Sequence, residues 1–579
     1  MQNFVNEIAR MLEKAGGPAA AETLSLLETP PQAGMGDYAL PCFILAKREK
    51  KNPAAIAADL AARLEPGDLI ERIDNRGPYL NFYVNHNAFI REALATIFNS
   101  GERYGTSDAG GGKTIVIDYS SPNIAKEFRV FHLRTTVLGH ALYNLYNALG
   151  YKVIGINHLG DWGTQFGVVI AAFRERGDER ALGEHPLKYL TSLYVDYNRR
   201  MAEDESLRVD AREWLKKLEE GDPEAKRLWK LFCDLSIKDF KRVYKRLGIE
   251  FQYYQGEAFY FKLADSVIEA AEKAGAAEES QGALVIKMPD ENIPPVILRK
   301  SDGATSYHTR DIAAAIYRRD NFHFHKLLYV VGAEQKLHFQ QLVHALRKMG
   351  FDWADGLVHV AHGLYLESQE VDGVQVKTKA GTRTGFKVVL EDILDDAIAR
   401  AEGVIDENYP DGFPGDKAAA AEAVGIGAIV FGDLKNSRIK DIVFDWDAAM
   451  SFKGETGPYL QYSHARLCSI LRKYGRPVEG DVDFGLLSDP EEYEIAKLAA
   501  QYPEVLKKAA DACEPSLLST YLLSVASAFN RYYTDISRHK VVDSANPELT
   551  RARVLLTDCA RLVLASGLNI LGIIPLSQM

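Results

Sequence analysis

A strand–helix–strand pattern between residues 114 and 157 restricts the fold more than any other feature of the sequence. Residues 114–119 and 152–157 are short runs of β-branched and apolar residues. Between them, residues 132–150 repeat apolar side chains at helical spacing. Two strands joined by one helix within about 45 residues predict a parallel pair with a right-handed crossover. The core of this chain is therefore predicted to be an open α/β sheet.

The remaining residues divide into segments around this unit. Residues 1–105 mix helical patterns with a strand-like run and predict a small α+β N-terminal domain. Residues 113–415 carry the α/β pattern, which charged helices interrupt over about 168–280 as an insertion. Residues 416–579 show helical patterns and no convincing strand. We predict an α/β fold with a doubly wound, Rossmann-like parallel-sheet core, a helical insertion and an all-helical C-terminal bundle.

Further strands are expected where short apolar runs return after the insertion. These runs lie at 283–288, 295–300, 326–331 and 357–362. We expect all four to continue the α/β pattern, with helices over 310–319 and 337–349.

Composition excludes several classes of protein. The 579 residues are 47% hydrophobic and 26% charged, which excludes a mainly disordered chain. The net charge of −11 requires any nucleic-acid surface to be a local basic face. The five cysteines are scattered without a C-x-x-C pair, so we expect a reducing compartment and no metal site. We find neither a signal peptide nor a run of about 18 apolar residues, and expect a cytoplasmic protein without a membrane partner.

Polar segments follow the first two predicted strands, where open parallel sheets bind ligands. After the first strand, residues 120–132 contain Lys126 and Arg129 and lead into a helix N-terminus near His132, which suits phosphate. A solvated loop explains that segment about equally well. After the second strand, residues 157–167 (NHLGDWGTQFG) concentrate glycines with an aspartate and a tryptophan. This density favours close backbone packing over an ordinary turn.

Two later segments add candidate polar groups. Tyr307 and Asp311 are spaced i, i+4 on a predicted helix that Thr305 or Ser306 caps, and they can bind a guanidinium group. Local pairing of Asp311 with Arg310 is favoured by spacing alone. The loop 376–387 is rich in small and basic residues and can clamp a polyphosphate, although a solvated loop is nearly as good an explanation.

Basic and aromatic side chains interleave over 459–473 and 529–540 of the helical segment. Such mixtures suit unpaired RNA, because bases stack on aromatic rings while cations meet phosphates. Core packing explains many of the aromatic residues taken singly, so the clustering is what supports an RNA surface.

Taken together, these segments resemble the arginyl-tRNA synthetases, a class I family, over nearly the whole chain. The resemblance rests on 118–126 (DYSSPNIAK), 157–167, 329–339 (YVVGAEQKLHF) and 454–466 (GETGPYLQYSHAR). Residues 36–39 fit the family's N-terminal module that contacts the tRNA elbow. The resemblance implies ATP-dependent formation of arginyl-adenylate, with Mg²⁺ accompanying ATP, and transfer of arginine to its tRNA. We expect a monomer.

The resemblance also implies roles for individual residues. Arginine-binding residues would be Asp118, Asn123, Tyr307, Asp311 and Gln335. ATP-binding residues would be Arg129, Val130, Phe131, His132 and Lys379, and catalytic residues would be Lys126, His132 and Arg383. tRNA-binding residues would be Tyr459, Tyr462, Arg466, Arg531 and Tyr532.

Two hypotheses follow from the way this chain departs from the family pattern. The family's His-x-Gly-His signature reads Arg129-Val130-Phe131-His132, and its Lys-Met-Ser-Lys-Ser signature aligns with 379–383 (KAGTR). Phe131 replaces the glycine that lets adenine approach the backbone. The first hypothesis is a working arginine–tRNA ligase, and the second is a weakened paralogue that binds tRNA or arginine in a regulatory role. Arginine activation for another acceptor is a third, weaker possibility.

Overall fold

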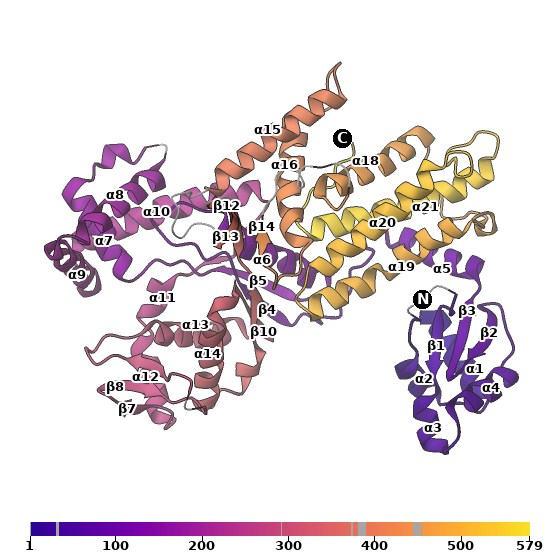
Figure 1. Cartoon of the computed structure of the whole chain (residues 1–579), viewed down its shortest axis with the longest axis horizontal. Helices are drawn as coiled ribbons and strands as arrows, with labels where there is room; N and C mark the ends of the chain where they lie inside the picture. The colour runs from indigo at the N-terminus through magenta and orange to yellow at the C-terminus, as the bar shows by residue number, and fades with distance from the viewer. Residues whose placement is uncertain are drawn as a thin grey trace.

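Three parts make up the molecule (Figure 1): an α/β body, a helical bundle beside it, and a small N-terminal domain. The computed structural model describes residues 2–30, 34–183, 185–290, 292–371, 374–379, 389–443, 451 and 454–579, with backbone alone at residue 2 and over 367–379. Within these residues, no helix is both long enough and apolar enough to cross a membrane.

Five parallel strands form the central sheet, in the order β11-β10-β4-β5-β6. The strands are β4 (Thr114–Asp118), β5 (Lys152–Asn157), β6 (Tyr253–Tyr254), β10 (Lys326–Gly332) and β11 (Leu357–His362). The crossover helix between β4 and β5 is α6 (Phe131–Ala148). The prediction of a parallel α/β core from residues 114–157 is confirmed, as are the strands predicted at 326–331 and 357–362.

The strands predicted at 283–288 and 295–300 do not join this sheet. They are β8 (Ala283–Ile286) and β9 (Val296–Arg299), which form a separate antiparallel sheet with β7 (Glu278–Ser280). In β9, buried and exposed residues alternate, as in a sheet covered on one face. By contrast, four of the five residues of β4 are buried. The apolar runs predicted strands correctly, but not the sheet to which they belong.

Among the strands that sequence reasoning missed, β6 and β14 have only two residues each. β6 lies within the insertion predicted as mostly helical and pairs with β5 in the central sheet. β14 (Ile442–Val443) lies after residue 416, where no strand was expected, and pairs in parallel with β12 (Tyr365–Val371). β12 also pairs with β13 (Val374–Lys379) in a hairpin.

Helices pack around these sheets. In the inserted region they are α7 (Thr164–Arg176), α8 (Pro186–Met201), α9 (Glu205–Glu220), α10 (Pro223–Arg246), α11 (Glu257–Phe261) and α12 (Ala264–Lys273). After it come α13 (Tyr307–Phe322), α14 (Lys336–Lys348) and α15 (Leu390–Asn408). Ser306 caps α13 by accepting a hydrogen bond from the N–H group of His308, as one of the two predicted caps.

The C-terminal bundle contains α16 (Lys417–Leu434), α18 (Gly457–Tyr474), α19 (Pro490–Asp511), α20 (Ser516–Thr534) and α21 (Pro547–Ile570). The N-terminal domain contains α1 (Gln2–Lys14), α2 (Ala20–Leu26), β1 (Tyr38–Pro41), α3 (Phe43–Glu49), α4 (Pro53–Arg63), β2 (Ile70–Arg76), β3 (Tyr79–Val84) and α5 (His86–Ser100). Helix α5 packs against α19 and α21, which attaches the N-terminal domain to the bundle (Figure 1).

Helix α6 lies very close to the end of β4. A Cβ atom at Gly139 would lie 2.2 Å from Cγ of Tyr119, whose side chain is completely buried. Thr136 donates a hydrogen bond to Ser120, and Thr135 donates one to the carbonyl group of Val330. Helix α6 is therefore fixed against the edge of the sheet from which the candidate site is built.

We predict that Gly139→Ala destabilises the protein, because the added methyl group must displace the Tyr119 ring. Overpacking of this kind lowers the free energy of unfolding by about 1–3 kcal/mol. Gly403→Ala is the matched control, since a Cβ atom there meets nothing within 4 Å. It should leave stability unchanged or raise it by up to about 1 kcal/mol. Urea unfolding followed by circular dichroism measures both, and equal effects would contradict the close approach of α6.

Candidate active site at the carboxyl edge of the sheet

Strands β4, β5 and β10 end side by side, and the loops that follow them carry the candidate residues. The loop after β4 is unusual, since Ser120, Ser121 and Ala125 have φ angles of 73°, 50° and 59°. Non-glycine residues rarely adopt this left-handed region and tend to do so at functional sites. The loop after β5 lies against it, because Asn123 bridges to Gly160. A Cβ atom at Gly160 would lie 2.2 Å from Oδ1 of Asn123, so glycine is required there.

Asp118, which was predicted to bind arginine, is already paired with a cation of the protein. Its Oδ2 atom lies 2.8 Å from Nη1 of Arg318 on α13, whose side chain has no exposed surface. Nη2 of Arg318 lies 3.2 Å from Nδ1 of His158, and Nε donates to the hydroxyl group of Tyr260. The nearby Tyr260 and Asp118 groups raise the pKa of Arg318 although burial opposes this. A ligand would have to displace a buried arginine to reach this oxygen of Asp118.

Asp311 has a weaker partner. Its Oδ2 atom lies 2.9 Å from Nε2 of His338, in the first turn of α14, and the Asp311 side chain is 27% exposed. Burial raises the pKa of Asp311, but the hydrogen bond and charge of His338, with His158 and Arg310, lower it below the ordinary value overall. The ring of Tyr307 lies 5.4 Å from that of His338 and is largely exposed. Gln335 is exposed one residue before α14.

Two further carboxylates lie near this pair. Oε2 of Glu257 accepts a hydrogen bond from Nε of Arg310 at 3.1 Å and lies 3.0 Å from Nη2. Arg310 therefore pairs with Glu257, and the alternative that it pairs with Asp311 is wrong. Asp161, in the loop after β5, accepts a hydrogen bond from the N–H group of Ala258. Burial raises the pKa of Asp161 to about 6.

The predicted nucleotide residues surround the start of α6. Phe131 is its first residue and is 40% exposed, and its ring lies 4.2 Å from that of His132. His132 is buried, and its Nδ1 atom accepts a hydrogen bond from the N–H group of Arg129. Burial, with the nearby Arg129, lowers the pKa of His132 to about 3. Val130 precedes the helix and is half-buried.

Arg129 is a half-buried cation at this helix start. Its Nε atom is buried and has no hydrogen-bond partner among the described residues. Burial lowers its pKa, and Glu127 opposes the shift. An incompletely paired guanidinium at a helix N-terminus fits an anionic ligand.

Lys126 is directed toward the inserted helices. Its Nζ atom lies 5.1 Å from the centre of the Tyr194 ring on α8, within the range of a cation–π contact. Arg383 lies outside the described residues, and so does the side chain of Lys379 at the end of β13.

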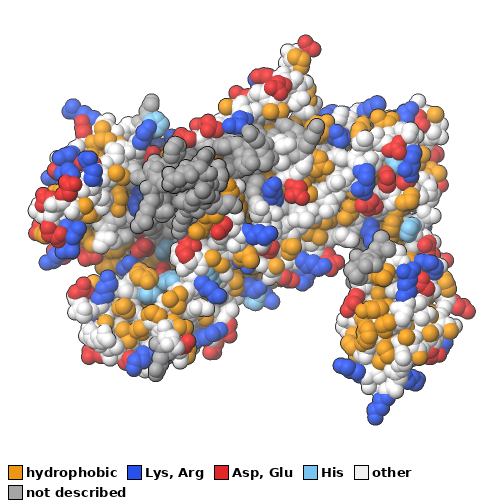
Figure 2. Space-filling model, viewed as in Figure 1, with side chains coloured by type: hydrophobic (Ala, Val, Ile, Leu, Met, Phe, Trp, Pro, Cys, Tyr) orange, Lys and Arg blue, Asp and Glu red, His pale blue; other side chains and the backbone are white. Residues whose placement is uncertain are grey.

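The aromatic and basic residues of the bundle separate into two groups. Tyr459, Tyr462 and Arg466 line a cavity of about 720 Å³ together with Asn530 and Met579. Arg466 donates hydrogen bonds to Tyr462 and Asn530, and its guanidinium lies over the Tyr462 ring. On the face shown in Figure 2, Lys and Arg side chains are interspersed with Asp and Glu over the inserted helices and the bundle.

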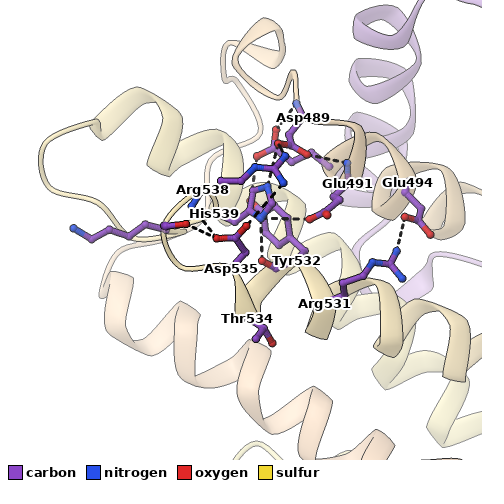
Figure 3. A network of polar contacts seen from close by, with 12 residues as sticks. Asp489, Glu491, Glu494, Arg531, Tyr532, Thr534, Asp535, Arg538 and His539 are labelled. Atoms are coloured by element: carbon purple, nitrogen blue, oxygen red, sulfur yellow. Dashed lines mark hydrogen bonds and ion pairs between the residues drawn. The ribbon is translucent and has the colours of Figure 1, made fainter.

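Arg531 and Tyr532 belong to the second group (Figure 3). Arg531 pairs with Glu494 at 2.6 Å on the surface. Tyr532 is completely buried and donates a hydrogen bond to Glu492. The prediction that Tyr532 contacts tRNA is not supported by this position, because the helices would have to separate before a base could reach the ring.

Asp489, Glu491 and His539 lie close enough together to suggest a cation site (Figure 3). However, Oδ2 of Asp489 already accepts a hydrogen bond from Arg538 at 2.6 Å and lies 3.1 Å from Nε2 of His539. Its Oδ1 accepts a hydrogen bond from the backbone at the N-terminus of α19, where the helix dipole disfavours a cation. We interpret the cluster as an ion-pair network that holds the α20–α21 loop against α19.

Comparisons with known proteins agree with this geometry. Residues 93–446 match the model of the class I tRNA synthetase (R) catalytic domain. Residues 460–579 match the DALR anticodon binding domain, and residues 2–84 match the arginyl tRNA synthetase N terminal domain. The chain belongs to the arginyl-tRNA synthetase family. The family resemblance deduced from the motifs is thereby confirmed.

Whole-chain relatives support the assignment to this family. Arginine–tRNA ligase from Alkaliphilus metalliredigens is 42% identical over 574 residues, covering 99% of each chain. The enzyme from Halothermothrix orenii is 43% identical over 95% of this chain and 94% of its own. The solved arginyl-tRNA synthetase of Thermus thermophilus matches all of both chains with a TM-score of 0.82 and 26% identity.

Sequence reasoning missed the two side chains that hold the acidic residues of this synthetase-family site. Arg318 follows Asp311 by seven residues, which places both on one face of α13. This spacing could have been noticed, but only the register β4–β10 brings Asp118 to the same place. His338 lies inside the motif 329–339, and nothing in its sequence position indicated contact with Asp311.

We predict that Asp118→Asn strongly destabilises the protein. The substitution leaves the buried guanidinium of Arg318 without a counter-charge, which lowers the free energy of unfolding by about 3–5 kcal/mol. Asp265→Asn is the matched control, because Asp265 pairs with Arg299 at 3.3 Å while 82% exposed. Asp265→Asn should lower the free energy of unfolding by less than about 1 kcal/mol. Urea unfolding compares the two variants, and a similar small effect for both would show that the buried pair does not hold this edge together.

Proposed function

We propose that the chain is an arginine–tRNA ligase. In the first step, a carboxylate oxygen of L-arginine attacks the α-phosphorus of ATP and releases pyrophosphate. In the second step, a hydroxyl group of the terminal ribose of arginine tRNA attacks the carbonyl carbon and releases AMP. The single observation that carries the proposal is Asp311, a partly exposed carboxylate at the carboxyl edge of the sheet that pairs with a histidine, His338.

Asp311 is the group that we propose for recognition of the arginine guanidinium. Asp118 and Glu257 are paired with Arg318 and Arg310, which stay charged at any physiological pH. Tyr307 lies one helical turn before Asp311 and supplies an exposed phenol on the same face. Asn123 and Gln335 are exposed in neighbouring loops and remain our proposed contacts to the rest of the amino acid.

The start of α6 is the proposed nucleotide site, and ATP would enter as its Mg²⁺ complex. Arg129 offers the incompletely paired guanidinium, and His132 accepts the Arg129 N–H group through Nδ1. With a pKa of about 3, His132 is neutral, so its hydrogen lies on Nε2 and can be donated to a phosphate oxygen. Lys126, Lys379 and Arg383 remain the proposed cations for the charged transition state. Val130 and Phe131 would lie beside adenine.

The proposed RNA partner would contact the bundle through Tyr459, Tyr462 and Arg466, which share one cavity. Arg531 is exposed enough to meet phosphate after leaving Glu494, whereas the ring of Tyr532 is completely buried. The anticodon binding domain model matches residues 460–579, which include Tyr462, Arg466 and Arg531. Tyr459 immediately precedes this range. We further propose a cytoplasmic monomer.

One observation favours the second candidate function, a weakened paralogue with a binding or regulatory role. Phe131 is a bulky residue at the position where the family signature has glycine. Its ring is 40% exposed at the first turn of α6, so it either covers the adenine site or rotates away from it.

Arginine-dependent exchange of pyrophosphate into ATP decides between these candidates. We expect exchange by the wild-type chain, measured with and without arginine tRNA. Phe131→Gly should lower the KM for ATP, because it restores space for adenine while keeping Arg129. If the wild type shows no exchange at millimolar ATP while Phe131→Gly does, the paralogue hypothesis is correct and the ligase proposal is wrong.

We also predict that Asp311→Asn raises the KM for arginine and leaves the KM for ATP unchanged. Removing the carboxylate deprives the guanidinium of a charge-assisted hydrogen bond, which corresponds to a roughly 10- to 100-fold effect. Asp320→Asn, an exposed position on the same helix, is the matched control. Equal arginine KM values for the two variants would remove Asp311 from the arginine site.

A further inference from the structure

His338 is the direct partner of the carboxylate proposed to recognise arginine. Its Nε2 atom lies 2.9 Å from Oδ2 of Asp311, and its side chain is only 16% exposed. Its other ring nitrogen, Nδ1, is buried and has no hydrogen-bond partner in the described parts of the chain. The ring therefore has one polar contact in this structure, and that contact is with Asp311.

The carboxylates of Asp118, Glu257 and Asp311 differ in whether the group that pairs with each of them can lose its positive charge. Arg318 and Arg310 hold Asp118 and Glu257 with guanidinium groups that do not titrate. His338 holds Asp311 with an imidazole, which can be either neutral or protonated. A neutral imidazole still donates its Nε2–H group to the carboxylate but leaves the negative charge of Asp311 uncompensated. Asp311 can then pair with a cationic ligand.

We propose that His338 is a positioning residue for arginine recognition: the neutral ring orients Asp311 toward the guanidinium, and the protonated ring opposes arginine binding. The inference rests on the proposed function, since it assigns a partner to the carboxylate of that same site. His338 lies within the 329–339 motif, whose sequence alone assigns it no role.

Other charged or titratable groups surround the pair and must be considered in any titration. They are His308 and Arg310 on α13, Tyr329 on β10, His359 on β11, Glu257 on α11 and His158 after β5. Burial lowers the pKa of His308, and the charge of His338 lowers it further. Burial likewise lowers the pKa of His359. Both shifts favour the neutral form of these two histidines.

The direction of the pH effect follows from linkage. A bound guanidinium places a second positive charge beside His338, so arginine and the proton each weaken the binding of the other. Arginine affinity should therefore be greatest where His338 is neutral and fall as the pH is lowered and the ring takes up a proton. The steepest possible dependence for one proton is about tenfold per pH unit.

The test is the dissociation constant of L-arginine between pH 5.5 and 8.5, measured by calorimetry on the full chain. Wild-type affinity should fall toward pH 5.5, whereas His338→Gln should remove most of the pH dependence, because its amide donates a hydrogen bond without titrating. His338→Phe, which cannot donate, should bind arginine more weakly than His338→Gln at pH 8. The matched control is His344→Gln, which changes a half-buried histidine on the same helix, in contact with the carbonyl group of Lys287, and should follow the wild type.

A second measurement does not depend on any variant folding correctly. Arginine binding to the wild type near pH 6 should release protons, which appear as a dependence of the binding heat on the ionisation enthalpy of the buffer. Absence of proton release, or a pH dependence that persists in His338→Gln, would overturn the inference. The proposed function fails separately, if the wild type neither binds nor activates arginine at pH 8.

Discussion

A buried ion pair between Arg318 and Asp118 is the interaction around which the candidate site is arranged. Arg318 has no exposed surface, and it joins helix α13 to the end of β4, the central strand of the sheet. Taking two charges out of water is costly, and the pair persists only with further polar contacts. Tyr260 and His158 supply these, so the loop after β5 and helix α11 are held in the same cluster.

This arrangement determines which acidic group is available to a ligand. Arg318 and Asp311 lie seven residues apart on one face of α13, so fixing one orients the other. The cation of Arg318 neutralises Asp118 within the protein, and Arg310 does the same for Glu257. Asp311 is partly exposed, and within the described parts of the chain its ion-pair partner is a histidine, His338. In the proposed function, specificity for a guanidinium follows from the negative charge of Asp311, which the protein pairs with a histidine and not with an arginine.

Much of the fold could be predicted from periodicity, because strands β4 and β5 and helix α6 have strong local patterns. Sheet membership could not, as β8 and β9 show, because pairing depends on which surfaces become buried. The two-residue strands β6 and β14 carry no local pattern at all. The motifs correctly placed Tyr307 and Asp311 close together on one helix. They also assigned Asp118 to arginine binding, because no local pattern indicated that Arg318, far away in the sequence, would pair with it. The burial of Tyr532 could not be predicted either, because aromatic residues in a helical bundle pack in the core as readily as they lie on a surface.

The most direct test of this account is an experimental structure of the protein with bound L-arginine. We predict that the ligand guanidinium lies within hydrogen-bonding distance of the Asp311 carboxylate, while Arg318 remains paired with Asp118. A structure in which Arg318 has left Asp118 and the ligand guanidinium has taken its place would contradict the claim that the buried pair selects Asp311.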